Sequence, residues 1–215
     1  MILPVSAATF AAFALVALGM VLTPGPNMIY LLSRSILQGR KAGFISLCGV
    51  LLGFVAYMLA AALGLTALLI AVPFAYETLQ WAGAAYLLWM AWNAIKPGAR
   101  SVLQPRHDLA FDGPRKLFFM GLLTNLLNPK IAVLYLSLLP QFIDPARGDV
   151  LAQGVTLGLT QIAISATVNG LIILGAGGIA VWFAARPSWL RIQRWLMASV
   201  LAGLALRLAL EKRAA

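Results

Sequence analysis

Six apolar stretches follow one another along the chain, and short polar segments separate them. A helix that crosses a lipid bilayer needs about 20 predominantly apolar residues. The pattern therefore predicts an all-α polytopic membrane protein with six transmembrane helices. The stretches lie at roughly 5–37, 42–71, 76–95, 117–142, 150–184 and 187–210.

Two of the stretches contain residues that a spanning helix normally avoids. The first carries Thr23-Pro24-Gly25-Pro26-Asn27, and the fourth carries Asn125-Leu126-Leu127-Asn128-Pro129-Lys130. Proline removes a backbone donor and clashes with the preceding turn, yet it suits the first turn of a new helix. We therefore expect both helices to break near mid-membrane and restart. Asn128 would cap the second restart, and Thr23 or Gly25 the first.

A restarted helix presents free N–H groups and the positive end of its dipole, which favour an anion such as a carboxylate. Lys130 lies 14 residues beyond Lys116, which is about 21 Å at helical rise and near the middle of the bilayer. An unpaired ammonium there costs at least about 2.5 kcal/mol. None of the six acidic residues is expected at that depth. We expect Lys130 to bind a carboxylate; the alternative is that it caps carbonyls freed by the break.

The basic residues predict the orientation. Eleven of the sixteen lie in the gaps 34–41, 96–116 and 186–194. Because basic residues accumulate in cytoplasmic loops, these three loops are predicted to be cytoplasmic and both termini outside. The basic C-terminal tail opposes this assignment, so it stays open whether the last helix crosses completely.

The chain divides into two similar halves, residues 1–95 and 117–215, joined by the loop 96–116. Gly49-Val-Leu-Leu-Gly53 returns 105 residues later as Gly154-Val-Thr-Leu-Gly158. Chance is the alternative, because such glycine pairs are common in membrane helices. Since helices one and four enter from opposite sides, the similarity predicts an inverted repeat, a common plan of secondary transporters.

Composition argues against several functions. The chain is 62% hydrophobic and only 10% charged, whereas soluble domains carry about 25% charged residues. The net charge of +10 is explained by membrane orientation, so nucleic-acid binding is not expected. Cys48 and His107 are the one cysteine and the one histidine, and no metal cluster, cofactor site or nucleophilic triad is predicted from them. A membrane-embedded enzyme is therefore disfavoured.

Other polar residues are weaker candidates. Gln153, Thr156 and Thr160 share a helix face, where they would line a pathway or hydrogen-bond a neighbouring helix. Arg34 is interpreted as a residue that snorkels from a helix end. The residues expected to line the pathway are Tyr57, Thr156, Thr160 and Gln161.

Several motifs occur together in a recognisable order. They are Thr-Pro-Gly-Pro-Asn at 23–27, Gly39-Arg-Lys-Ala-Gly43, Gly49-xxx-Gly53, Gly83-Ala-Ala-Tyr86-Leu-Leu, Asn125-Leu-Leu-Asn-Pro-Lys130 and Leu139-Pro-Gln-Phe142. From about residue 5 to 210 the chain resembles the LysE/RhtB family of bacterial amino-acid exporters. The resemblance implies a six-helix inner-membrane exporter of amino acids or related small molecules, without an enzymatic step. It points to a functional core of Pro24, Gly25, Pro26, Asn27, Asn128, Pro129 and Lys130, and we predict that these residues and Asn125 bind the solute.

The chain departs from the family pattern at two positions. Many members carry an acid at the position of Asn27 and a histidine or acid near Tyr57. Both differences remove a titratable group, so coupling to a proton gradient stays open, as does homo-oligomerisation. We predict secondary efflux of small zwitterionic amino acids by alternating access, with Asn27 and Asn128 hydrogen-bonding the solute. The alternatives are export of a non-amino-acid solute and a membrane scaffold or assembly protein.

Overall fold

Two long helices form the centre of the protein. The computed structural model describes residues 4–71, 73–97, 111–184 and 187–210, and every regular element in these ranges is helical. Helix α3 (Arg40–Ala71) and helix α7 (Val150–Ala184) pack against each other. Their segments Arg40–Gly64 and Val150–Ala176 are long and apolar enough to cross a membrane. The all-α membrane class is thus confirmed.

Two further spans are broken. Helix α1 (Ala7–Leu22) is followed after a break by α2 (Pro26–Gln38), at a bend of 53°. Helix α5 (Pro114–Leu126) is followed by a second helical segment, at a bend of 50°. Both breaks fall where the prolines predicted them. The second segment consists of α6 (Pro129–Val133), a π turn η1 (Leu134–Leu138) and a 3₁₀ turn η2 (Leu139–Phe142).

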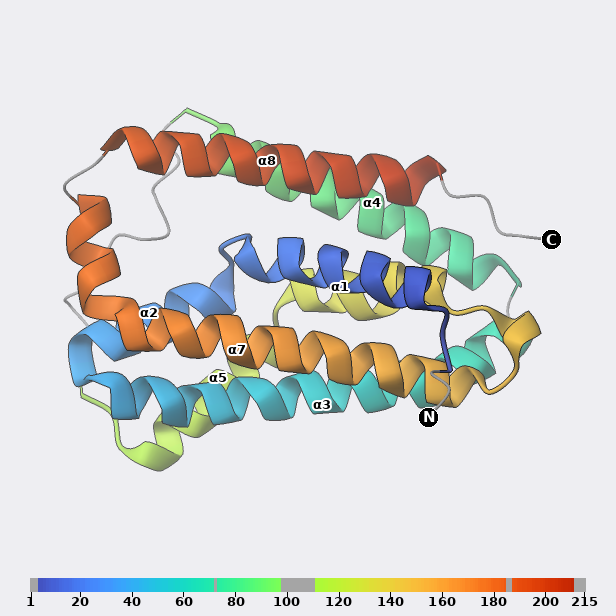
Figure 1. The fold of residues 1–215 in the computed structure, drawn as a ribbon, viewed down its shortest axis with the longest axis horizontal. Helices are drawn as coiled ribbons and strands as arrows, with labels where there is room; N and C mark the ends of the chain where they lie inside the picture. Colours follow the sequence, from blue (N-terminus) through green and yellow to red (C-terminus); the bar gives the residue numbers. More distant parts are fainter. Residues whose placement is uncertain (1–3, 72, 98–110, 185–186, 211–215) are drawn as a thin grey trace.

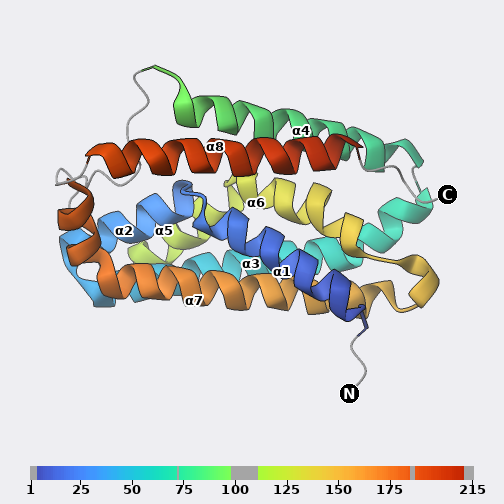
Figure 2. The same ribbon diagram turned by 45° about the horizontal axis from the view of Figure 1, so that its top comes forward.

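The last two long helices, α4 (Pro73–Ile95) and α8 (Pro187–Leu210), lie side by side on one flank of the bundle (Figures 1 and 2). By length and composition the described residues contain two spanning helices, or four if each bent pair is one span. Helix α8 contains Arg191, Arg194 and Arg207, and α4 is rich in Trp and Tyr, which lowers the mean hydropathy of both helices. Six crossings therefore remain a prediction.

The ends of the helices are sorted by charge. Helices α2, α4 and α7 finish at one end of the bundle, next to the segments where the sequence places its basic residues (Figure 1). The start of α1 and the end of α8 lie at the other end, together with the 3₁₀ turn η3 (Pro145–Arg147). This distribution matches the loops assigned to a common side from the sequence.

Glycines allow α3 and α5 to touch through their backbones. A Cβ atom added to Gly49 would lie 2.0 Å from Phe118 O, and one added to Gly121 would lie 2.2 Å from Ser46 O. Small residues of this kind let membrane helices approach closely and gain van der Waals contact. The contact fixes α5, and with it the second break, against the centre of the protein.

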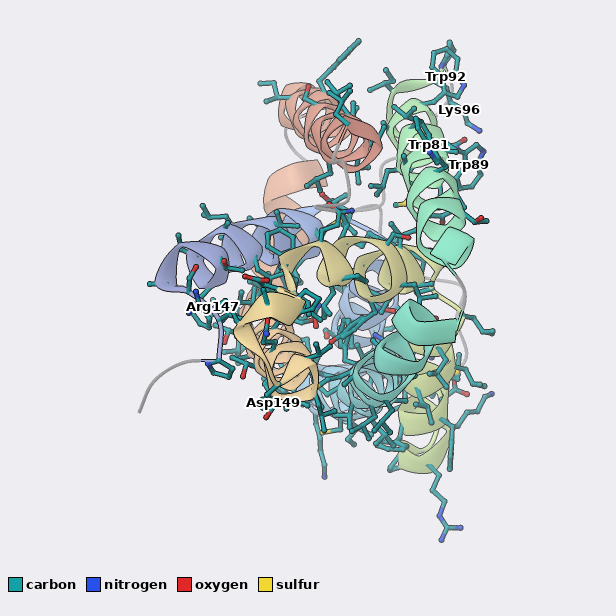
Figure 3. The ribbon with its side chains drawn as sticks, turned by 90° about the vertical axis from the view of Figure 1, so that its right-hand side faces the viewer. Trp81, Trp89, Trp92, Lys96, Arg147 and Asp149 are labelled. Carbon is teal, nitrogen blue, oxygen red and sulfur yellow. The ribbon has the colours of Figure 1, made fainter. Side chains whose placement is uncertain are left out.

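The outer face of α4 carries tryptophans. Figure 3 looks along the bundle and shows Trp81, Trp89 and Trp92 projecting away from the other helices. Each of these side chains is about 60% exposed. Trp81 and Trp92 are eleven residues apart, about three helical turns, so they share one face of the helix. This apolar surface is suited to contact with lipid.

Candidate functional site

Both restarted helices begin with a cap followed by proline. The Asn128 side chain accepts a hydrogen bond from the backbone N–H of Lys130 (3.1 Å), and Pro129 is the first residue of α6. In the first half Gly25 is the N-cap of α2 and Pro26 is its first residue. The predicted restart is therefore present in both halves, and Gly25 is the cap used in the first.

Thr23 ends α1 instead of starting α2. Its backbone N–H and its hydroxyl both donate to Gly19 O, at 3.1 and 2.8 Å. Pro24 follows, and it has no N–H with which to satisfy Met20 O four residues earlier. The last carbonyls of α1 carry the negative end of the helix dipole and need donors from elsewhere.

Lys130 supplies those donors. Its side chain is buried, with 5% exposure, and its Nζ donates to Met20 O at 2.8 Å and to Thr23 O at 2.5 Å. The ammonium is thus paired with helix-end carbonyls, which is the alternative that the sequence left open. A lysine ammonium has three N–H donors, so the two bonds leave one for another acceptor.

A cavity lies beside this lysine and collects residues from both breaks and from α7. The cavity measures about 340 Å³ when its open mouth is included. Only about 20 Å³ of this volume is wide enough to take the centre of a water molecule. That is room for a water molecule or two, so an amino acid must widen the cavity to enter. Its polar lining consists of Gly25, Asn27, Asn128, Lys130, Gln161, Ser165 and Asn169.

Several buried amide groups at this cavity have no hydrogen-bond partner among the described residues. These are both side-chain atoms of Asn27, Nδ2 of Asn128 and Nε2 of Gln161. All three side chains are at most 7% exposed. An unsatisfied buried polar group costs about 1–3 kcal/mol. Such a cluster at one cavity marks a place where a polar solute would be stabilised.

The polar face of α7 is formed by Gln161, Ser165 and Asn169, at successive spacings of four residues. Gln161 Oε1 accepts from the Tyr135 hydroxyl at 3.1 Å, and Asn169 Nδ2 donates to Ser165 O at 2.8 Å. Sequence reasoning chose Gln161 but missed Ser165 and Asn169. Their common spacing is the signal that could have identified them, because residues four apart share a helix face.

Gln153, Thr156 and Thr160 have other contacts and are not among the residues that line the cavity. The Thr160 hydroxyl donates to Thr156 O at 2.8 Å within α7. Gln153 closes the turn before α7, because its Nε2 donates to Gly148 O at 2.6 Å. The side chains of Gln153 and Thr160 therefore hydrogen-bond the local backbone.

Tyr57 and Asn125 lie near the second break, outside the cavity lining. The Tyr57 hydroxyl donates to Leu126 O at 2.8 Å, so it caps the end of α5 much as Lys130 caps the end of α1. Its ring stacks on Tyr135, with centroids 5.8 Å apart. Asn125 is fully buried against Gly53, where an added Cβ would lie 2.7 Å from Asn125 Oδ1.

Arg34 does not snorkel to solvent, contrary to the interpretation from sequence. Its side chain is 3% exposed and its Nη2 lies 2.6 Å from Asp112 Oδ2. Lys116 Nζ lies 2.6 Å from the other carboxylate oxygen. A hydrogen bond from Lys116 and the nearby Arg34 guanidinium hold the pKa of Asp112 below its ordinary value. Arg34 and Asp112 are 78 residues apart in the chain, so their ion pair ties α2 to the segment just before α5.

A buried polar cavity between two broken helices of an apolar bundle is the arrangement of a membrane transporter. The sequence agrees with this class. The model of the LysE type translocator family matches residues 18–212, so the chain belongs to the LysE type translocator family.

Several relatives are similar over most of their length. The chain is 34% identical over 175 residues to a homoserine/homoserine lactone efflux protein of Salmonella typhimurium, covering 80% of this chain and 82% of the relative. It is 28% identical over 196 residues to a leucine efflux protein of Klebsiella pneumoniae, covering 90% and 91%. It is 30% identical over 180 residues to an uncharacterized membrane protein of Pseudomonas aeruginosa, covering 82% and 83%. No solved structure matches the chain.

Proposed function

We propose that this protein exports amino acids or close analogues across the bacterial inner membrane. The observation that carries the proposal is the cavity where Lys130 meets the unpartnered amides of Asn27, Asn128 and Gln161. Membership of a translocator family and relatives named for homoserine and leucine efflux support an amino-acid solute. The solute's carboxylate would lie between Lys130 and the start of α2, where Asn27 donates to it.

Transport would proceed by alternating access between two inverted halves. Several features support this part of the proposal. The two breaks bend by 53° and 50°, and Asn27 and Lys130 occupy the same second position of their restarted helices. Each half supplies one long central helix and one helix of the α4–α8 pair. The end of the bundle at which α2, α4 and α7 finish would face the cytoplasm, with both termini outside.

Coupling to a proton gradient is limited by the residues at the cavity. Lys130 is the one side chain with a full charge in its described lining, and no carboxylate is among these residues. A proton moving through this site would therefore travel on Lys130 or on the solute itself.

Counterflow into proteoliposomes tests the proposal. Vesicles loaded with an unlabelled amino acid should accumulate the labelled one when the protein is present, across at least part of a panel of all common amino acids. Lys130→Met should abolish counterflow, and Lys41→Met, which removes an exposed ammonium at the start of α3, should retain it.

Two results would contradict the proposal. Counterflow at the wild-type rate in Lys130→Met would show that Lys130 is not part of the solute site. No counterflow with any amino acid, by protein that is folded and inserted, would favour a scaffold protein or an exporter of another solute.

A further inference from the structure

The carbonyls at the end of α1 form a small cation site. Met20 O has lost its helical donor because Pro24 has no N–H. Thr23 O follows at the end of the same helix, and the two carbonyls converge on a single ammonium, that of Lys130. The negative end of the α1 dipole adds to their preference for a cation. Met20 itself lines the cavity, so this cation site adjoins the space proposed for the solute.

The rest of the cavity is better suited to an anion. The unpartnered nitrogen atoms Nδ2 of Asn27, Nδ2 of Asn128 and Nε2 of Gln161 are all donors. No acidic side chain is among the described lining residues. An α-amino acid brings a carboxylate, which these donors fit, and an ammonium, which they do not. The one unpartnered side-chain acceptor among the described lining residues is Asn27 Oδ1, a single neutral oxygen. The two α1 carbonyls that Lys130 occupies are better placed for an ammonium, because they converge on one point at the negative end of a helix dipole.

We propose that the solute's α-ammonium displaces Lys130 from the carbonyls of Met20 and Thr23, while Lys130 turns to the solute's carboxylate. This inference rests on the proposed transport of amino acids and specifies how both charges of the solute are bound. The lysine would pass over Gly25, whose missing side chain leaves the path clear: an added Cβ would lie 3.2 Å from Nζ and 3.4 Å from Cε.

The exchange makes both solute charges necessary. A solute with only a carboxylate would draw Lys130 away and leave two buried carbonyls without donors. A solute with only an ammonium would displace Lys130 and leave a buried charge unpaired, which is costly. A zwitterion provides an ammonium for the two carbonyls and a carboxylate for Lys130, so both are paired. A second cation on the solute has no acidic partner in the lining, so neutral amino acids should be preferred to lysine or arginine.

The exchange also links binding to movement. Lys130 belongs to the second half and is bonded to carbonyls of the first half, 107 and 110 residues away. Displacement of Lys130 would release this bond between the halves when a zwitterion is bound, and would leave it in place when the site is empty. Solute binding would thereby free one half to move against the other.

Modified amino acids test this inference. L-Serine, L-threonine and L-leucine are compared with their methyl esters, which lack the carboxylate, and with their N-acetyl derivatives, which lack the ammonium. Each compound competes in the counterflow assay with the neutral amino acid that the wild-type protein transports best. Both kinds of derivative should compete at least tenfold more weakly than the parent amino acid.

The variant Lys130→Met separates the exchange from simple pairing with a carboxylate. It frees the carbonyls of Met20 and Thr23, so in a thermal-shift binding assay the ester should bind Lys130→Met at least tenfold more tightly than it binds the wild-type protein. Simple pairing of Lys130 with a carboxylate would leave the ester's affinity unchanged. Lys130→Arg keeps a cation that reaches carboxylates and should preserve the wild-type order; it also serves if Lys130→Met does not fold.

The outcomes distinguish the two levels of the proposal. Equal competition by parent, ester and N-acetyl derivative would overturn the exchange while transport stands. So would an ester that binds Lys130→Met no more tightly than it binds the wild-type protein. Absence of counterflow with every amino acid would overturn the transport function itself.

Discussion

Gly25→Ala tests the position of the Lys130 ammonium directly. Gly25 has an extended backbone (φ −157°, ψ −175°) that alanine adopts without strain. The three atoms nearest to an added Cβ all belong to Lys130: Nζ at 3.2 Å, Cε at 3.4 Å and Cδ at 3.7 Å. The methyl group would therefore press on one side chain and leave its charge intact.

The size of the effect follows from how the lysine is held. Non-bonded heavy atoms prefer separations of about 3.5–4.0 Å, so the ammonium must shift by a few tenths of an ångström. Two hydrogen bonds to α1 carbonyls, at 2.8 and 2.5 Å, resist this shift. Overpacking of a filled site costs about 1–3 kcal/mol. We expect Gly25→Ala to lower the free energy of unfolding by about 1–2 kcal/mol, or roughly 2–8 °C in Tm.

A double-mutant cycle isolates the contact. Thermal unfolding in detergent is measured for Gly25→Ala, Lys130→Ala and the double variant. The cost of replacing glycine at the N-cap is the same whether or not Lys130 is present, so it cancels when the two values for Gly25→Ala are subtracted. The cost of Gly25→Ala should fall by about 1 kcal/mol or more when Lys130 is shortened. An equal cost in both backgrounds would refute the placement of the ammonium over Gly25.

Three further predictions follow from other contacts. Asn27→Leu should raise Tm, because it removes a buried amide without a partner at a gain of about 1 kcal/mol, and it should lower counterflow several-fold; a stability loss would show that Asn27 has a structural partner. Gly49→Ala should destabilise by more than about 2 kcal/mol, since its Cβ meets the α5 backbone, whereas Gly64→Ala, with nothing within 4 Å, should be neutral or stabilising in circular-dichroism melts. Asp112, whose pKa is lowered from 3.8, should stabilise the fold above pH 4 and lose that contribution as pH falls through its lower folded pKa; Asp112→Asn should remove this acid-side dependence of Tm, and an unchanged profile would contradict the ion pair with Arg34.

Local chemistry explains what could be predicted without a structure. Apolar stretches, prolines and capping residues act on their own neighbours, so the two helix breaks and the role of Asn128 followed from sequence spacing. The motifs around Pro24 and Pro129 were enough to indicate the family, which the family model then confirmed.

Contacts between distant segments could not be predicted in the same way. Arg34 was interpreted as a snorkelling residue because its partner Asp112 lies 78 residues further along the chain, in the loop that joins the two halves. Ser165 and Asn169 were overlooked because many polar residues follow one another on α7, and only packing against the breaks decides which of its faces lines the cavity. Thr160 lies on the same helix, but its hydroxyl bonds within it.

Lys130 shows where sequence and tertiary structure divide. Residue spacing is enough to predict that a lysine follows a helix break deep in an apolar segment, because helix rise and proline geometry are local properties of the chain. The partner of this lysine depends on the folded structure, because the carbonyls of Met20 and Thr23 come from a helix end more than 100 residues away. A buried ammonium accepts either a carboxylate or helix-end carbonyls, and the folding of the two halves against each other places the carbonyls within its reach.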